Sequence, residues 1–208
     1  MTKELTKKAK QFWEKQQIYP NYSNIKTRRL YEINYLVPKI HKNKFNTILD
    51  LGCGNGDLIK CLEALTEVEN YYAYEYSENL LNCLPDNNKI IKKVYDCTNP
   101  VQLPVSDLTI FSGVAPFIFD DQNLEEIFSL IKSDYLFFKS PFSLEEEVLV
   151  DKFSDELNSH YCSKYRNIEN VLPMIKKYFK IIEINKIYPE GIESKFSTKQ
   201  IAFWCEKR

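Results

Sequence analysis

The sequence predicts an α/β fold: a doubly wound, mostly parallel sheet of seven strands with an antiparallel last strand, preceded by a helical segment. From residue 46 onward, short apolar strand segments alternate with segments whose apolar residues recur at helical spacing. The last two strand segments, 180–187 and 200–206, are joined by only about a dozen residues. That connection is too short for a helical crossover, so we expect these two strands to be antiparallel.

The first 45 residues differ from the rest of the chain. Helical spacing of apolar residues predicts helices over 3–18 and 27–40, the second ending near Pro38. We therefore divide the chain into an N-terminal helical segment, 1–45, which could act as a lid, and one domain, 46–208.

Periodicity and turn signals predict the strands and helices of the domain. The predicted strands are 47–51, 71–76, 89–95, 108–111, 135–139, 180–187 and 200–206. The predicted helices are 57–66, 77–84, 123–131 and 168–179. Residues 140–166 fit neither pattern cleanly, and they follow the fifth strand at the edge where ligands bind in such sheets. We interpret them as an insertion over the site, with an ordinary helix and loop as the alternative.

Composition excludes several classes of protein. No stretch of about 18 uncharged apolar residues exists, and the charged N-terminus lacks the apolar core of a secretory signal, so we expect a cytoplasmic protein without a membrane span. The six cysteines include no C-x-x-C pair, and the only histidines are His41 and His160. We therefore expect reduced thiols and no metal site.

Charge is unevenly distributed. Residues 1–45 hold 11 Lys/Arg against 3 Asp/Glu, whereas the whole chain has a net charge of −1. A basic N-terminal segment could attract nucleic acid or an anionic substrate. Alternatively, it neutralises an acidic body, and the dispersed lysines favour this second interpretation.

Three of the five glycines lie together after the first strand, in Asp50-Leu51-Gly52-Cys53-Gly54-Asn55-Gly56-Asp57. Glycine permits a sharp turn and lets a ligand approach the backbone, and a helix follows this turn. The G-x-G-x-G spacing differs from the G-x-G-x-x-G of dinucleotide sites, and no Gly-Lys-Ser/Thr follows as in a phosphate-binding loop. Carboxylates at both ends suit a cationic ligand better than a pyrophosphate.

This motif resembles motif I of class I S-adenosylmethionine-dependent methyltransferases of the small-molecule type, and the resemblance extends over about residues 46–206. It implies S-adenosyl-L-methionine as cofactor and S-adenosyl-L-homocysteine as product. It also implies that Asp50 faces the methionine ammonium, Glu75 the ribose hydroxyls, and Asp96 the adenine amino group. The cofactor-binding residues implied are Asp50, Gly52, Cys53, Gly54, Gly56, Glu75, Tyr76, Asp96, Cys97, Ser112 and Gly113.

The segment after the fourth strand and the residues of the insertion predict the kind of acceptor. Enzymes that methylate nucleobases or glutamine amides carry Asn/Asp-Pro-Pro-Tyr/Phe after the fourth strand, whereas this chain has Ser112-Gly113-Val114-Ala115-Pro116-Phe117. We expect a small-molecule acceptor, methylated on an oxygen of a sugar or sugar-linked metabolite, phosphorylated forms included. His160 is the candidate general base, with a plain surface histidine as the alternative. Candidate substrate-binding residues are Tyr22, Arg28, Tyr161, Tyr165 and Arg166, because tyrosines stack on rings and arginine binds anions.

Two other functions remain open from the sequence. One is methylation of tRNA or rRNA with residues 1–45 as a basic arm, although we expect no nucleic-acid partner. The other is a non-catalytic, cofactor-binding partner subunit.

Overall fold

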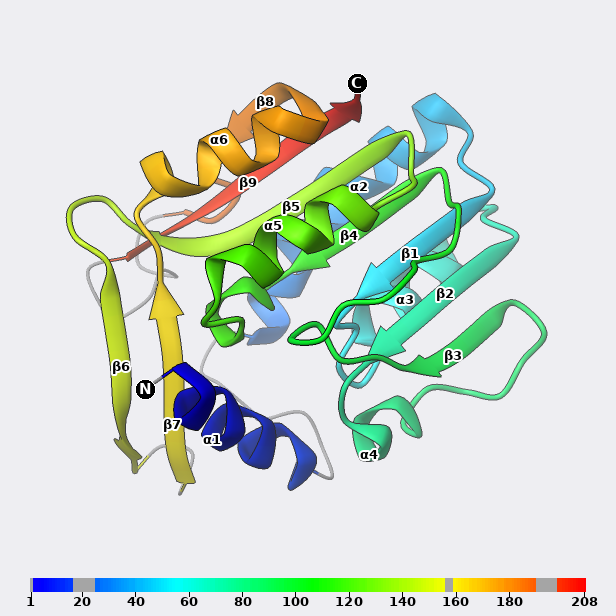
Figure 1. Ribbon diagram of the computed structural model, residues 1–208. Coiled ribbons are helices and arrows are strands. Elements are labelled where there is room, and N and C mark those ends of the chain that lie inside the picture. The colour runs from blue at the N-terminus through cyan, green and yellow to red at the C-terminus, as the bar shows by residue number, and fades with distance from the viewer. Residues whose placement is uncertain (1, 17–24, 156–158, 190–197) are drawn as a thin grey trace.

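The computed structural model describes residues 2–16, 25–155, 159–189 and 198–208, and a seven-stranded sheet forms its centre (Figure 1). The strand order is β3-β2-β1-β4-β5-β9-β8. The strands are β1 Thr47–Leu51, β2 Asn70–Glu75, β3 Ile90–Val94, β4 Leu108–Ser112, β5 Tyr135–Ser143, β8 Phe179–Asn185 and β9 Thr198–Lys207. In this sheet β9 is antiparallel to both of its neighbours, β5 and β8, and the other described strand pairs are parallel. The predicted fold class is confirmed, and the structure adds that β9 lies between β5 and β8.

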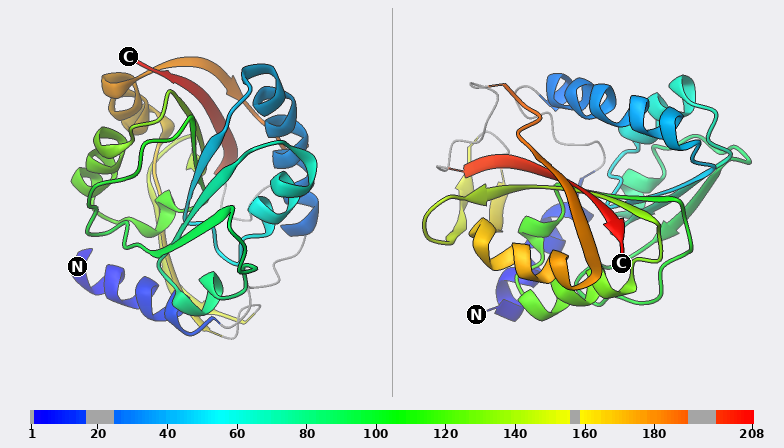
Figure 2. Two further views of the ribbon diagram at one scale, coloured as in Figure 1. Left: turned by 90° about the vertical axis from the view of Figure 1, so that its right-hand side faces the viewer. Right: turned by 90° about the horizontal axis from the view of Figure 1, so that it is seen from above.

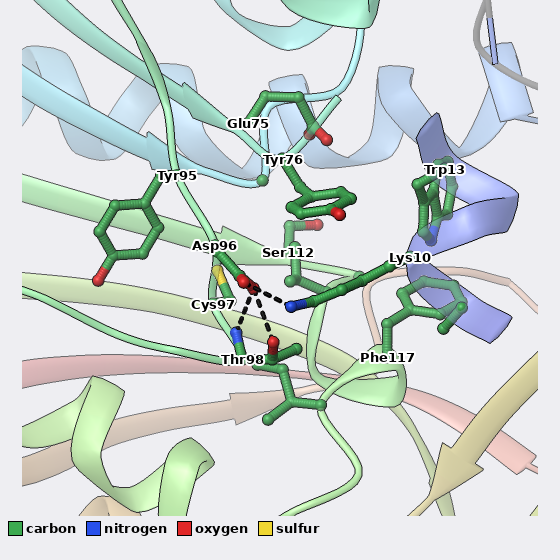
Figure 3. A pocket seen from close by; sticks show the side chains of 15 residues that line it. Lys10, Trp13, Glu75, Tyr76, Tyr95, Asp96, Cys97, Thr98, Ser112 and Phe117 are labelled. Atoms are coloured by element: carbon green, nitrogen blue, oxygen red, sulfur yellow. Dashed lines mark hydrogen bonds and ion pairs between the residues drawn. The ribbon is translucent and has the colours of Figure 1, made fainter. Parts of the chain in front are cut away.

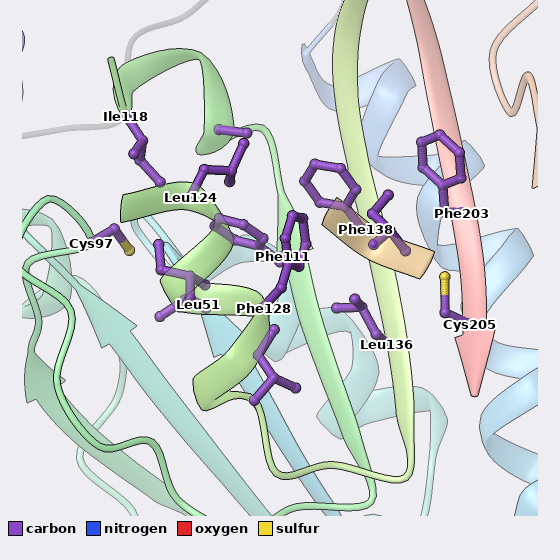
Figure 4. Packing of buried hydrophobic residues seen from close by; sticks show 14 of the residues in the cluster. Leu51, Cys97, Phe111, Ile118, Leu124, Phe128, Leu136, Phe138, Phe203 and Cys205 are labelled. Atoms are coloured by element: carbon purple, nitrogen blue, oxygen red, sulfur yellow. The ribbon is translucent and has the colours of Figure 1, made fainter. Parts of the chain in front are cut away.

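Helices cover both faces of the sheet (Figure 2). On one face lie α2 Ile25–Asn43, α3 Asp57–Leu65 and the short α4 Glu78–Leu81, which bury apolar residues in one cluster. On the other face lie α5 Asp121–Leu130 and α6 Ile168–Tyr178. Phe128 of α5 packs on Phe111 of β4 and Phe138 of β5, and the three rings have centroid distances of 5.1–6.2 Å (Figure 4). Two apolar layers therefore hold the sheet rigid and fix its strand ends.

Side-chain caps begin three of these helices. Ser77 Oγ accepts a bond from the Leu80 N–H, Asp120 from Gln122, and Asn167 from Glu169. The expected end of the second helix near Pro38 is wrong, because α2 continues through this proline to Asn43. The helix ends instead at Lys44, whose φ of 54° breaks the helical geometry.

Residues 140–166 do not form the alternative helix and loop. Their first part prolongs β5 to Ser143, and the rest contains an antiparallel hairpin of β6 Val148–Ser154 and β7 Ser159–Tyr165. Helix α1 Thr2–Glu14 lies against this hairpin (Figure 1). Leu5 and Ala9 of α1 pack with Cys162 of β7 and Phe119. The hairpin therefore carries α1 on the side of the sheet's carboxyl edge.

The strand order indicates where a ligand would bind. Strands β1 and β4 are neighbours, and the strand order reverses between them, so the carboxyl ends of these two strands flank the crevice where doubly wound sheets bind ligands. Among the helices that the structure describes, none has the length and apolar character needed to cross a bilayer.

Candidate functional site

The glycine-rich turn joins β1 to α3 and lies at this crevice. Gly52 has a φ of 84°, and its N–H donates to the Tyr74 carbonyl of β2 at 2.7 Å. A Cβ on Gly52 would lie 2.1 Å from a methyl group of Val114, which belongs to the turn after β4. Glycine at this position thus lets two loops from neighbouring strands pack directly together.

Glu75 ends β2 beside the turn. Its carboxylate accepts a hydrogen bond from the Gly54 N–H at 2.8 Å and another from the Ser77 N–H at 3.0 Å. Burial raises the pKa of Glu75, and these N–H donors oppose that rise. The backbone therefore holds this carboxylate in one orientation, and two oxygens with several lone pairs can accept further bonds from a ligand.

Asp96 follows β3 and is held in the same way. It accepts hydrogen bonds from the N–H and hydroxyl of Thr98, at 2.9 and 2.7 Å, and it forms an ion pair with Lys10 of α1 at 2.5 Å (Figure 3). Burial would raise the pKa of Asp96, but the hydrogen bonds from Lys10 and Thr98 outweigh burial and hold it below its usual range. Asp96 is consequently ionised at neutral pH.

One cavity joins these groups (Figure 3). Its empty space is about 660 Å³, part of it open to solvent. Seven of the predicted cofactor residues line it: Gly52, Glu75, Tyr76, Asp96, Cys97, Ser112 and Gly113. Asp50, Cys53, Gly54 and Gly56 do not line it, and they belong to β1 and to the turn that shapes its wall.

Helix α1 covers the cavity. Its Ala9, Lys10 and Trp13 contribute to the lining, and the Trp13 ring meets the edge of Phe117 at a centroid distance of 5.1 Å. Glu14 at the end of α1 accepts a hydrogen bond from the Tyr76 hydroxyl at 2.5 Å. In contrast, α2 packs against one face of the sheet, so the two N-terminal helices do not form one cover.

A buried polar network lies beside the cavity at Ser112. Glu32 of α2 pairs with Lys139 of β5 at 2.9 Å and with Arg29 at 2.5 Å, and it accepts a hydrogen bond from the Tyr188 hydroxyl at 2.5 Å. The Ser112 hydroxyl donates to the same Glu32 oxygen at 3.4 Å. Burial disfavours the Glu32 anion, but these partners lower its pKa to about 2. Both carboxylate oxygens of Glu32 therefore have partners, as a buried carboxylate requires.

Asp50 lies in β1, the strand next to β4, and β4 ends at Ser112. Its side chain is buried, and burial raises its pKa to about 7, with Arg29 opposing the rise and Glu32 and Glu75 adding to it. A buried acid of this kind favours a cationic ligand group, which would restore its charge.

Those residues predicted to bind the acceptor that the structure describes lie outside the cavity. His160 stands on the exposed face of β7 beside α1, and Tyr161 packs against the rings of Phe12 and Phe117. Arg166 is buried, and it donates to Asp121 and to the carbonyls of Ala115 and Ile118. It therefore holds the turn η1 Ala115–Phe117, which lines the cavity.

The remaining acceptor candidates are dispersed. Tyr165 is buried in β7 with its hydroxyl 3.4 Å from that of Tyr161, and the Arg28 guanidinium lies 6.0 Å from the Tyr188 ring centroid. Tyr22 lies outside the described residues. None of the described candidates therefore lies at the cavity wall, and the acceptor-binding roles of the whole set stay predictions.

Sequence reasoning missed several residues of the site. Lys10 and Thr98 at Asp96, and Glu32 and Tyr188 beside Ser112, carried no assigned role. One signal was available: Glu32 is an acid among Ile33, Leu36 and Ile40 on the buried face of α2. A lone acid on an apolar helical face indicates a buried partner.

Comparison with known proteins gives matches by structure only. No family model and no curated protein matches the sequence. A structure of an S-adenosylmethionine-dependent methyltransferase from Leishmania major has a TM-score of 0.67 at 14% identity, covering 98% of this chain and 83% of that one. The N-methyltransferase NodS from Bradyrhizobium japonicum, in complex with S-adenosyl-L-homocysteine, has a TM-score of 0.64 at 10% identity, covering 97% and 100%.

An O-methyltransferase from a polyketide synthase of Brevibacillus brevis, also in complex with S-adenosyl-L-homocysteine, has a TM-score of 0.62 at 11% identity, covering 91% of this chain and 81% of that one. Enzymes named for transfer to nitrogen and to oxygen therefore share this architecture. The chain has the Rossmann-like fold of S-adenosylmethionine-dependent methyltransferases.

Proposed function

We propose that the protein is an S-adenosylmethionine-dependent methyltransferase that acts on a small molecule. The observation that carries this proposal is the convergence of Glu75, Asp96 and the glycine turn on one cavity beneath α1. Fixed carboxylates at the ends of β2 and β3 suit a ribose diol and an exocyclic amine, since both ligand groups are hydrogen-bond donors. The buried Asp50 suits the ammonium group of the methionine moiety.

The chain's own residues contribute mainly position and charge. S-adenosylmethionine supplies the methyl group as a cationic sulfonium. Glu75 and Asp96 orient the adenosine, while α1, through Ala9 and Trp13, limits the access of water to the cavity. Ser112 is the polar side chain on the side of β4, and Glu32 behind it can accept a hydrogen bond from its hydroxyl.

The finer part of the proposal concerns the acceptor, which we take to be a hydroxyl oxygen of a sugar or sugar-linked metabolite. The Ser112 hydroxyl supports a hydroxylated acceptor, because it lines the cavity, donates to the buried Glu32, and can accept a hydrogen bond from another hydroxyl. The cover by α1 supports a small one. His160 is not carried into this mechanism, because it does not line the cavity.

Charge pairing argues against the RNA alternative. Lys8 pairs with Asp151, Lys10 with Asp96, and Lys39 with Glu183. Part of the positive charge of residues 1–45 therefore neutralises the acidic body rather than forming a free basic arm.

Calorimetric titration with S-adenosyl-L-homocysteine tests the cofactor assignment. We expect saturable 1:1 binding that Glu75→Gln weakens by about 1–3 kcal/mol, because an ionised hydrogen-bond acceptor becomes neutral. Glu78→Gln, an exposed acid three residues later, is the matched control and should bind normally. Equal affinity in all three proteins would refute the assignment.

Transfer of a labelled methyl group to pools of sugars, sugar phosphates, amines and RNA tests the acceptor. Label in the sugar pools supports the finer proposal, and label in RNA or amines replaces it. Cofactor binding without label in any pool, or in a cell extract, would favour the non-catalytic partner subunit.

A further inference from the structure

A second cluster of reactive side chains lies on the β6–β7 hairpin, apart from the cavity. Asp151 stands opposite Cys162 in the strand register, and His160 precedes Cys162 by two residues. Because side chains alternate along a strand, His160 and Cys162 point to the same face, where Asp151 meets them. One ligand atom from each of the three residues lies within 4.8 Å of the other two.

We propose that Asp151, His160 and Cys162 form a site for a zinc ion. The three side chains offer a carboxylate oxygen, an imidazole nitrogen and a sulfur, which are the ligand atoms that Zn²⁺ takes in proteins. Three protein ligands leave the fourth tetrahedral position to water. This proposal goes beyond the proposed methyl transfer and does not depend on it.

The present distances are close to those of a zinc site. The sulfur of Cys162 lies 3.1 Å from Asp151 Oδ1, and the His160 Nε2 hydrogen-bonds to the same oxygen. Ligand atoms on a tetrahedral Zn²⁺ are about 3.5 Å apart, given zinc–ligand distances of about 2.0–2.3 Å. A small outward movement of each side chain therefore makes room for the ion.

Atoms and charges balance in this exchange. The ion takes the place of two hydrogens that now point at Asp151 Oδ1, one on the thiol and one on the imidazole nitrogen. The thiol proton goes to solvent. The imidazole proton leaves Nε2, and the ring takes one up on Nδ1 from solvent, so that the Nε2 lone pair faces the ion. Zinc chemistry involves no change of oxidation state, so no other reactant is needed.

Lys8 of α1 is the group that opposes a cation here. Its ammonium is nearer to Oδ2 of Asp151, at 3.0 Å, than to Oδ1, at 3.4 Å. The ion would sit on the Oδ1 side, so Lys8 can keep its ion pair while repelling the metal. Solvent has access, because the His160 side chain is 46% exposed and that of Asp151 33% exposed.

The rigidity of the hairpin favours the site, and its position gives it a structural effect. Ligands on paired strands keep their geometry better than ligands on loops. Since α1 packs on β7 through Leu5, Ala9 and Cys162, a zinc ion would fasten the two strands that carry the cover of the cavity.

Metal titration of the chelator-treated protein tests the proposal. We expect one Zn²⁺ per chain, and a thiolate-to-cobalt absorption band when Co²⁺ is the probe. His160→Ala should weaken Zn²⁺ binding by at least about tenfold, and it is a safe change because the side chain is exposed. Cys162→Ser should abolish the cobalt band, with near-ultraviolet circular dichroism confirming that the variant folds.

Matched controls use the other exposed histidine and an exposed cysteine. His41→Ala and Cys83→Ser should bind Zn²⁺ and Co²⁺ as the unmodified protein does. Lys8→Met should strengthen Zn²⁺ binding severalfold, because it removes a repelling charge. Absence of saturable binding, loss of binding in His41→Ala or Cys83→Ser, or weaker binding in Lys8→Met would each overturn the proposal.

Discussion

The two halves of the cavity are built in different ways. The cofactor half consists of strand ends and the turns that directly follow them, with Glu75 and Asp96 bonded to backbone N–H groups only two positions away. The covering half brings α1, η1 and β7 together from distant parts of the chain, through contacts such as Lys10 to Asp96 and Arg166 to Ala115. The first half is specified locally and the second by tertiary packing, so substitutions should affect them differently.

The largest effect is expected at the turn of the cofactor half. Gly52→Ala should destabilise the fold by about 3–4 kcal/mol, because it adds a clash with Val114 to the strain of a positive φ. Gly113→Ala is the comparison, since it has a φ of 77° but no atom within 4 Å of the added Cβ, and it should cost about 1–2 kcal/mol. Chemical denaturation measures both values, and equal losses would show that contact between the loops is unimportant.

In the covering half, Arg166→Ala should destabilise the protein by about 2–4 kcal/mol. Its removal takes the charged donor from the buried carbonyls of Ala115 and Ile118, of which the Ala115 carbonyl keeps only its bond from the Ile118 N–H. Denaturation of this variant distinguishes a structural from a substrate-binding role. An unchanged free energy of unfolding with impaired turnover would restore Arg166 as an acceptor contact.

Asp50 predicts a pH dependence of the cofactor half. Its pKa of about 7 means that the carboxyl is mostly neutral at pH 6 and mostly ionised at pH 8. A cationic ligand binds the ionised form, so affinity for S-adenosyl-L-methionine should rise about tenfold over this range, and Asp50→Asn should remove the rise. Calorimetry at several pH values checks this, and a flat profile in the unmodified protein would contradict the placement of the ligand cation.

The raised pKa of Asp50 also affects stability: the pH range that favours ligand binding lowers the contribution of Asp50 to the free energy of unfolding. The folded protein holds the Asp50 proton more tightly than the unfolded chain, whose carboxyl ionises near 3.8. The contribution of Asp50 to the stability of the ligand-free protein is therefore fully present at low pH and is lost as the pH rises through about 7.

The smallest expected effect is at the contact between the halves. Lys10→Met should strengthen cofactor binding by up to about fivefold, because a partly exposed ion pair worth about 0–1 kcal/mol no longer competes for Asp96. Lys7→Met, on the exposed side of α1, is the control and should change nothing. Weaker binding in Lys10→Met would show that Lys10 contacts the ligand or holds α1 in place.

The sequence was sufficient for the locally specified half. Strand periodicity, the clustered glycines and the acids that follow β2 and β3 predict the sheet and much of the cavity wall. It was not sufficient for β6 and β7, since neither seven-residue strand alternates cleanly between apolar and polar residues. It also missed the Lys10–Asp96 pair, because no local signal links residues that are 86 positions apart.

Histidine and cysteine at i and i+2 illustrate the same difference. A search for C-x-x-C pairs looks for ligands on a tight turn, and His160-x-Cys162 does not fit that pattern. On a strand, however, this spacing places both side chains on one face. Only the pairing with β6 supplies the third member, Asp151.

The position of β9 has a consequence for the order of synthesis. On the ribosome, β8 emerges before β9. Among the described strands, β8 pairs with β9 alone, and β9 also pairs with β5, which emerged much earlier. We therefore expect the nascent chain to hold an exposed edge on β5 until β9 has emerged, and such an unpaired edge favours aggregation.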